Sequence, residues 1–147
     1  MAKIKPELYR KILEGIELQN IYLRNFDGKI NLDVFPKDGV AEISSVADFT
    51  IKTENLVEIT QKWTIIGKDK STKSEFLNIS VTYGLILYSK EKFSKDFFDI
   101  YEKTSLPINV WPFVREFVNS ITARMNVPPL TLPLLKFTQK ERVKKVK

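Results

Sequence analysis

Three segments of this chain alternate apolar and polar residues over many positions, and this alternation constrains the fold more than any other feature. The segments are 41–54, 56–67 and 75–88. Successive side chains of a strand point to opposite faces, so the pattern predicts antiparallel strands with one covered and one polar face. The apolar odd positions are Ala41, Ile43, Ala47, Phe49, Ile51, Val57, Ile59, Trp63, Ile65, Leu77, Ile79, Val81, Tyr83, Leu85 and Leu87.

A fourth strand is predicted ahead of these three, over 16–35. Its apolar parity shifts twice, first between Leu18 and Ile21 and then between Leu23 and Ile30. Each shift reverses the side chains unless a β-bulge absorbs one residue. We expect the second bulge or turn at Asp27-Gly28, and a hairpin at the same place is the alternative. Short connections near Asn55 and over 68–74 predict a meander.

Helices are predicted at both ends of the sheet segment. Residues 4–16 repeat apolar side chains every fourth position, and Gly15 can end this helix in the left-handed conformation. After the last strand, Ser94 can cap a short helix and Asn109 a longer one. The apolar stripe of the longer helix comprises Val110, Phe113, Val114, Phe117, Val118, Ile121 and Met125.

The predicted fold class is therefore α+β. It is a four-stranded antiparallel sheet, a meander with a bulged first strand, with two C-terminal helices on one face. We divide the chain into an N-terminal helical extension (1–15), an α+β domain (16–137) and a basic C-terminal tail (138–147). The tail holds five basic residues and one acidic residue, which is most of the net charge of +6. We interpret it as a solvated or frayed segment rather than a phosphate-binding arm.

Composition argues against most enzyme classes. The chain has no His and no Cys, which removes zinc clusters, thiol nucleophiles, disulfides and His-based triads. We expect neither an enzyme nor a cofactor or metal. No apolar run has the length of a membrane span, and the N-terminus lacks the apolar core of a signal peptide. We therefore expect no membrane insertion and a cytoplasmic location.

Apolar residues continue past the last predicted helix into a proline-rich segment. Five of the seven prolines lie between Leu106 and Phe137, and prolines keep such a segment out of an interior strand. Its apolar side chains must bury themselves elsewhere. They can pack on the sheet of their own subunit, join a subunit interface or line a groove that receives other chains. The residues concerned are Val127, Leu130, Leu132, Leu134, Leu135 and Phe137.

Three patches of the sequence carry a resemblance to a known family. The first two are Ile21-Tyr22 followed by Ile30-Asn31-Leu32-Asp33, and Phe76-Leu77-Asn78 with Tyr83-Gly84. The third, which is more specific, is Asn109-Val110-Trp111-Pro112-Phe113-Val114-Arg115-Glu116, then Arg124, then Pro128-Pro129-Leu130-Thr131-Leu132-Pro133. Together they resemble the SecB family of protein-export chaperones.

The resemblance implies an ATP-independent holdase that binds unfolded polypeptides in apolar grooves. It also implies a homotetramer, built as a dimer of dimers, with the long helices between the sheets. The client-binding residues would be Phe35, Phe49, Ile51, Trp111, Leu132, Leu134 and Phe137. The subunit interface would use Val114, Phe117, Val118, Ile121 and Met125.

Docking on the translocase motor ATPase, which export members perform, would use Asp27, Asp33 and Leu77. The chain departs from the family here, since Lys29 and Ile79 stand where acidic residues are expected. A solitary SecB-like chaperone with another client, such as a labile antitoxin, would keep the groove and lose this docking site.

Two other functions are weighed against the chaperone. A nucleic-acid-binding module would use the sheet and the basic tail, but the predicted polar face is poor in the aromatic residues that stack on bases. An enzyme or small-ligand carrier would draw on Asp33, Asp48, Glu54 and Glu58, whose spacing predicts no contact between any pair. The chaperone is the preferred function.

Overall fold

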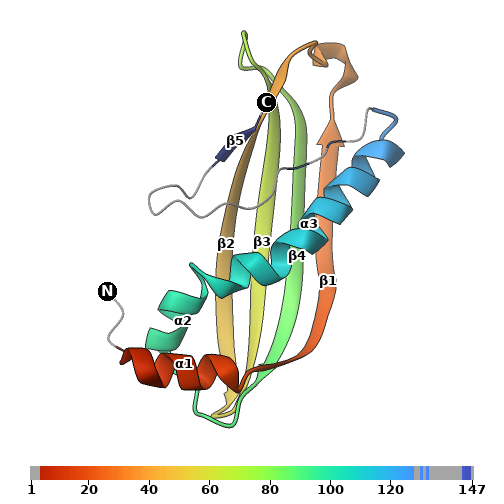
Figure 1. Cartoon of the computed structure of the whole chain (residues 1–147). Helices are drawn as coiled ribbons and strands as arrows, with labels where there is room; N and C mark the ends of the chain where they lie inside the picture. Colours follow the sequence, from red (N-terminus) through yellow and green to blue (C-terminus); the bar gives the residue numbers. More distant parts are fainter. Residues whose placement is uncertain (1–3, 128–129, 131, 133–143, 147) are drawn as a thin grey trace.

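The computed structural model describes residues 4–127, 130, 132 and 144–146. Of residues 144–146 it describes the backbone alone. Its elements follow in the order α1 (Pro6–Glu14), β1 (Glu17–Ile30), η1 (Leu32–Val34), β2 (Gly39–Thr53), β3 (Leu56–Asp69), β4 (Glu75–Tyr88), α2 (Lys95–Tyr101), α3 (Ser105–Arg124) and β5 (Lys144–Val146). The strands form a single antiparallel sheet in the order β1-β4-β3-β2-β5, and α3 runs obliquely across it (Figure 1). The predicted α+β class is confirmed.

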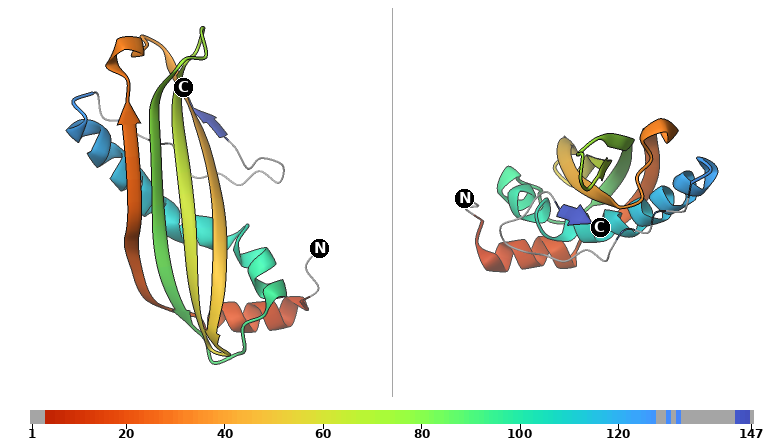
Figure 2. Two further views of the ribbon diagram at one scale, coloured as in Figure 1. Left: turned by 180° about the vertical axis from the view of Figure 1, so that it is seen from behind. Right: turned by 90° about the horizontal axis from the view of Figure 1, so that it is seen from above.

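Burial along β3 and β4 alternates as the sequence pattern predicts. Their odd residues lie under the helices, and Val57, Ile65, Val81 and Leu85 have no exposed surface at all. All three α-helices lie on this one side of the curved sheet, as the view from above shows (Figure 2). One apolar sheet face and its helical cover therefore make the core.

The meander holds for β2, β3 and β4 but does not extend to β1. β1 pairs with β4, at the side of the sheet opposite β2, which gives the strand order of a Greek key. The connection from Asn31 to Asp38 crosses the end of the sheet, where Asn31 N donates to Phe76 O and Lys70 N donates to Asp38 O. Short turns make neighbours of consecutive strands, whereas this longer connection leaves β1 free to pair elsewhere.

β1 has two register shifts, one between Leu18 and Asn20 and one between Leu23 and Asn25. The first is where the sequence predicts it. The second was wrongly expected at Asp27-Gly28, and the hairpin alternative is wrong as well, since both residues pair regularly with β4. After the second bulge, between Leu23 and Asn25, the side chain of Phe26 lies on the helix side of the sheet. Its ring centre is 5.3 Å from that of Phe117.

Two of the three expected helix ends differ from the prediction. Ser94 caps α2 as predicted, with Phe97 N donating to Ser94 Oγ over 3.2 Å. Gly15 ends α1 with a right-handed φ of −93° rather than a left-handed one. α3 already begins at Ser105, so Asn109 lies inside the helix, where its Nδ2 donates to Tyr101 Oη over 2.8 Å.

Polar side chains of α3 hold the described part of the proline-rich segment. Arg115 Nε donates to Leu132 O over 2.9 Å, and Leu130 N donates to Thr122 Oγ1 over 2.8 Å. Leu132 has no exposed surface. At Leu132 the segment therefore packs within its own subunit, which was the first of the three expected destinations.

Candidate functional site

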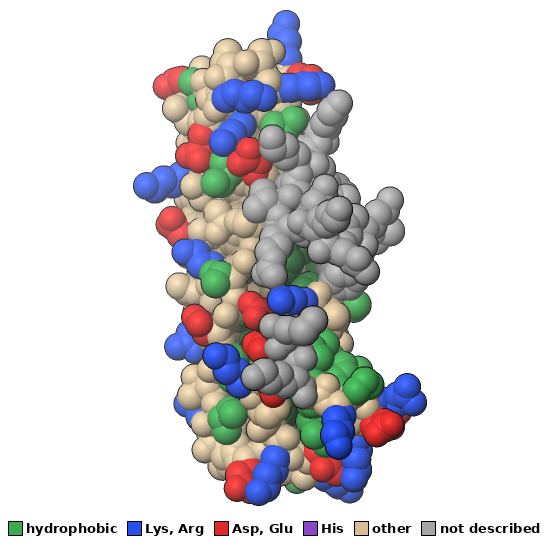
Figure 3. All heavy atoms as spheres, turned by 90° about the vertical axis from the view of Figure 1, so that its left-hand side faces the viewer, with side chains coloured by type: hydrophobic (Ala, Val, Ile, Leu, Met, Phe, Trp, Pro, Cys, Tyr) green, Lys and Arg blue, Asp and Glu red, His purple; other side chains and the backbone are tan. Residues whose placement is uncertain are grey.

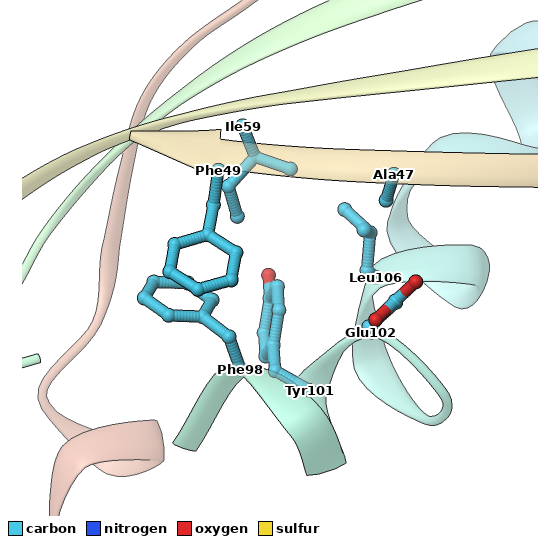
Figure 4. A pocket seen from close by; sticks show the side chains of 7 residues that line it. All are labelled: Ala47, Phe49, Ile59, Phe98, Tyr101, Glu102 and Leu106. Atoms are coloured by element: carbon cyan, nitrogen blue, oxygen red, sulfur yellow. The ribbon is translucent and has the colours of Figure 1, made fainter. Parts of the chain in front are cut away.

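A shallow apolar pocket lies where the turn between α2 and α3 meets the edge of the sheet at β2. Phe49 of β2 and Phe98 of α2 stack with ring centres 4.2 Å apart and planes inclined by 21° (Figure 4). We call it the β2 pocket, and its lining consists of Ala47, Phe49, Ile59, Phe98, Tyr101, Glu102 and Leu106. The empty space, counted out to solvent, is about 200 Å³. Small-molecule sites usually enclose about 300 Å³ or more, whereas this pocket is shallow and open, so it offers an apolar surface for contact rather than a cofactor site.

Glu102 is the one charged residue of this lining. Burial raises the pKa of Tyr101 to about 12, while the hydrogen bond from Asn109 partly opposes this rise. Tyr101 is therefore neutral at physiological pH. The lining is apolar except for Glu102 and the Tyr101 hydroxyl. It therefore suits contact with a hydrophobic side chain better than acid–base catalysis.

The structure brings together two of the predicted client-binding residues, Phe49 and Ile51, on the helix side of β2. Phe49 lines the β2 pocket, and Ile51, two residues further along, is 45% exposed. Phe35 is 40% exposed but lies near the other end of the sheet, packed edge-on against Phe76. It does not belong to the same pocket.

Two further predicted client-binding residues, Trp111 and Leu132, are buried in the core. Trp111 lies 4.9 Å from Trp63, centre to centre, and is 5% exposed. In this conformation neither offers surface to a client. Leu134 and Phe137 fall outside the described residues.

The predicted subunit-interface residues divide into two groups. Val114 and Val118 have no exposed surface, because they face the sheet of their own protomer. Phe117, Ile121 and Met125 are half-buried and pack against the core.

A strip of accessible apolar side chains lies beside these half-buried residues, between β1 and α3. It comprises Leu23 at 40%, Phe26 at 57% and Phe113 at 43% exposure, with Phe117 between them and the core. We call these four residues the β1–α3 strip. Sequence reasoning missed Leu23, Phe26 and the pocket residues Phe98 and Tyr101 as contact candidates. The parity of β1 was the available signal for the first two.

The residues proposed for motor docking do not form one surface. Leu77 is 4% exposed and lies under the helices, while Asp33 is exposed in η1. Asp27 is exposed on the opposite, polar side of β1, and Lys29 follows it two residues later on that side.

The polar face of the sheet carries charges of both signs. Lys52 pairs with Glu58 at 3.7 Å, and Lys68 pairs with Glu42 at 3.3 Å. At these two positions an acidic side chain lies beside each lysine, unlike the uniformly basic stripe that is typical of a nucleic-acid-binding surface.

The four acidic residues considered for catalysis are dispersed, and two of them are in ion pairs. Glu58 pairs with Lys52, and Glu54 pairs with Lys92 at 3.4 Å, at the end of the sheet away from Asp33. Within the described residues no cluster of three metal-ligating side chains occurs, and no helix is long and apolar enough to cross a membrane.

A curved antiparallel sheet, with the three described α-helices on one side and an apolar pocket beside β2, defines a two-layer α+β protein. More specifically, the chain has the SecB-like fold. It matches the solved structure of a SecB-like chaperone from Mycobacterium tuberculosis in complex with a ChAD peptide from the HigA1 antitoxin, with a TM-score of 0.74. The match covers 90% of this chain and 99% of that chain, at 15% sequence identity.

A protein of unknown function from Streptococcus agalactiae matches more weakly. Its TM-score is 0.48 at 13% identity, over 81% of this chain and 97% of that one. No protein-family profile and no curated protein sequence matches the chain. The evidence for the fold therefore comes from the arrangement of the strands and helices.

Proposed function

We propose that this protein is an ATP-independent chaperone that holds unfolded polypeptide segments against its apolar surface. The observation that carries this proposal is the set of large apolar side chains left accessible on a SecB-like fold. Phe49 and Ile51 lie at the edge strand, and the β1–α3 strip lies across the sheet from them. Accessible apolar patches of this kind mark surfaces that bind other chains.

The β2 pocket is assigned to the client. Apolar burial requires no fixed polar partners and therefore tolerates many sequences. The pocket offers a shallow aromatic wall against which an apolar side chain can pack, and Ile51 extends the apolar surface along β2. In a space-filling view of this side of the molecule, hydrophobic side chains gather toward the end where α1 and α2 lie (Figure 3).

The β1–α3 strip is assigned to a second subunit of a homo-oligomer, with a tetramer as the expected state. Half-buried Phe117, Ile121 and Met125 would lie at the border of that interface. Light scattering tests this assignment, because Phe26→Asp should reduce a tetramer to smaller species. A wild-type protein with the mass of a single chain would contradict the assignment.

A dedicated client is favoured over general export. Of the proposed motor-docking residues, Leu77 is buried, and Lys29 interrupts the negative charge near Asp27. The related M. tuberculosis chaperone was solved with an antitoxin peptide. We infer that a labile antitoxin or a similar partner is the preferred client class, and a cytoplasmic location stays a prediction.

The test is suppression of aggregation of a chemically unfolded client, measured by light scattering at stoichiometric ratio without ATP. Wild-type protein should suppress aggregation. Ile51→Ser should weaken suppression severalfold, whereas Leu8→Ser, a matched control at 44% against 45% exposure on α1, should not. A folded protein that suppresses nothing would refute the chaperone proposal. Equal losses in both variants would refute the assignment of the site.

A further inference from the structure

The outer edge of β2 is occupied over only part of its length, by the C-terminal strand of the same chain. β5 pairs antiparallel with β2 in the register Ala41 with Val146, Glu42 with Lys145 and Ile43 with Lys144 (Figures 1 and 2). Beyond this contact, from Ser44 to Thr53, β2 has no strand partner on its outer side among the described residues. The outer edge of β2 therefore accepts an antiparallel strand, and it has room for a strand longer than the three described residues of β5.

The two long edges of the sheet differ in their surroundings. β1 carries two register shifts and borders the β1–α3 strip, which is assigned to a second subunit. β2 keeps unbroken register with β3 from Gly39 to Ile51 and contains no proline. From Ser44 to Ile51 its open part is regular and unbulged, and these are the properties of an edge that pairs with another chain.

Apolar side chains lie directly beside the open part of this edge. Ala47 and Phe49 line the β2 pocket, and Ile51 follows them at 45% exposure. A strand added to β2 would lie about 4.8 Å away and direct every second side chain toward the helix side. Alternate side chains of that strand would then pass over the pocket while its backbone pairs with Ser44–Thr53.

We propose that an extended client segment binds by adding to the β2 edge as an antiparallel strand, and that β5 is its internal competitor. This inference rests on the proposed chaperone function and specifies how the client is held. The segment recognised is one with apolar residues at alternate positions and no proline in the paired stretch. β5 covers Ala41–Ile43, so a client that extends past Ser44 must displace it.

β5 is suited to being displaced. Among the described residues it pairs through three positions, and the tail that carries it, TQKERVKKVK, has few apolar side chains. If β5 occupies the β2 edge for part of the time, a client binds only to the molecules in which the edge is free. The apparent affinity for the client is then the intrinsic affinity multiplied by the fraction of free molecules. The basic tail would thus set the threshold for client binding without touching the pocket.

The first experiment uses a synthetic peptide of alternating Val and Thr, measured by fluorescence anisotropy against the full chain. Two N-methylated versions carry the methyl groups on odd or on even amides. In an added strand, every second amide N–H group points to β2, so one of the two methylated peptides loses these hydrogen-bond donors. The affinity of that peptide should fall at least about 10-fold relative to the parent peptide. Hydrogen exchange should slow at Ser44–Thr53 with the parent peptide and stay unchanged along β1.

The second experiment separates strand pairing of the tail from its charge. Lys145→Pro removes the central amide of β5, and Lys145→Gln removes the same charge while keeping the amide. Lys145→Pro should tighten peptide binding by about 3- to 10-fold, and Lys145→Gln should leave it within about 2-fold.

Each outcome has a defined meaning. If both methylated peptides bind as well as the parent, strand addition is wrong and the chaperone function stands. If the two Lys145 variants behave alike, the competitor role of β5 is wrong. If the peptide does not bind and the folded protein suppresses no aggregation, the chaperone proposal fails together with this inference.

Discussion

The side chain of Tyr22 on β1 lies over Gly84 on β4 and reaches past it to Glu58 on β3. Tyr22 and Gly84 are register partners, and a Cβ added to Gly84 would come 2.6 Å from Tyr22 Oη. Tyr22 Oη donates to Glu58 Oε2 over 3.2 Å, and Glu58 also pairs with Lys52 of β2. The absence of a side chain at Gly84 is what lets one tyrosine connect three strands. Two separate patches of the SecB resemblance thus meet in a single contact.

Gly84→Ala should lower the free energy of unfolding by about 1–3 kcal/mol, because the new methyl group displaces the tyrosine ring. Urea denaturation measures the effect. In a Tyr22→Ala background the same substitution should cost much less, since the obstructing ring is gone. Equal costs in the two backgrounds would mean that the contact with Tyr22 is not the reason for the glycine.

Leu132→Ala should destabilise the protein by about 2–4 kcal/mol, because a fully buried leucine leaves a cavity. Ile51→Ala, on a residue that is 45% exposed, should cost less than about 1 kcal/mol. Thermal denaturation compares the two variants. A small effect at Leu132 would show that its side chain does not pack on α3 in solution.

Gln61→Met should stabilise the fold by about 1 kcal/mol. Gln61 is 1% exposed in the middle of the apolar face of β3, and its Oε1 is a buried acceptor without a hydrogen-bond partner. Removing an unsatisfied buried acceptor while keeping the side-chain volume recovers part of its desolvation cost. Chemical denaturation checks the gain, and a loss of stability would indicate a partner for Gln61 in solution.

Stability should fall as the pH rises through about 10 to 12. Burial is the main cause that raises the pKa of both Tyr83 and Tyr101 to about 12, so each stays protonated in the folded state while the unfolded chain ionises near 10. The unfolded state then binds fewer protons, and each tyrosine lowers stability by at most about 1.4 kcal/mol per pH unit. Denaturation at pH 9 and pH 11 tests the sign, and ultraviolet absorbance follows tyrosine ionisation directly. Unchanged stability would contradict the raised pKa values.

Several features of the fold were predictable because they follow from local patterns. The alternation in 41–54, 56–67 and 75–88 identified β2, β3 and β4, and the parity shift between Leu18 and Ile21 identified the first bulge. Ser94 identified the start of α2. Each of these signals depends on neighbours within a few residues, which is the range over which backbone geometry and side-chain direction are coupled.

Other features needed contacts that are distant in the chain. The second bulge, between Leu23 and Asn25, accompanies the packing of Phe26 on Phe117, and Asn109 lies inside α3, hydrogen-bonded to Tyr101, rather than at its cap. Of the candidate site, Phe49 and Ile51 were found from the strand pattern, whereas Phe98 and Tyr101 join them only through the turn between α2 and α3. A large aromatic residue in a sequence gives no sign of whether it lies in the core or at a rim.

The sequence by itself determined the α+β class, the two faces of the sheet and the surplus of apolar side chains, because period and composition are properties of the chain alone. Only the tertiary structure decided where that surplus went. It buried Trp111 and Leu132, left Phe26 and Ile51 accessible, and set β1 beside β4 and β5 beside β2. The physical reason is that burial and edge pairing are competitions among segments far apart in the chain, and their outcome depends on which segments reach the same surface.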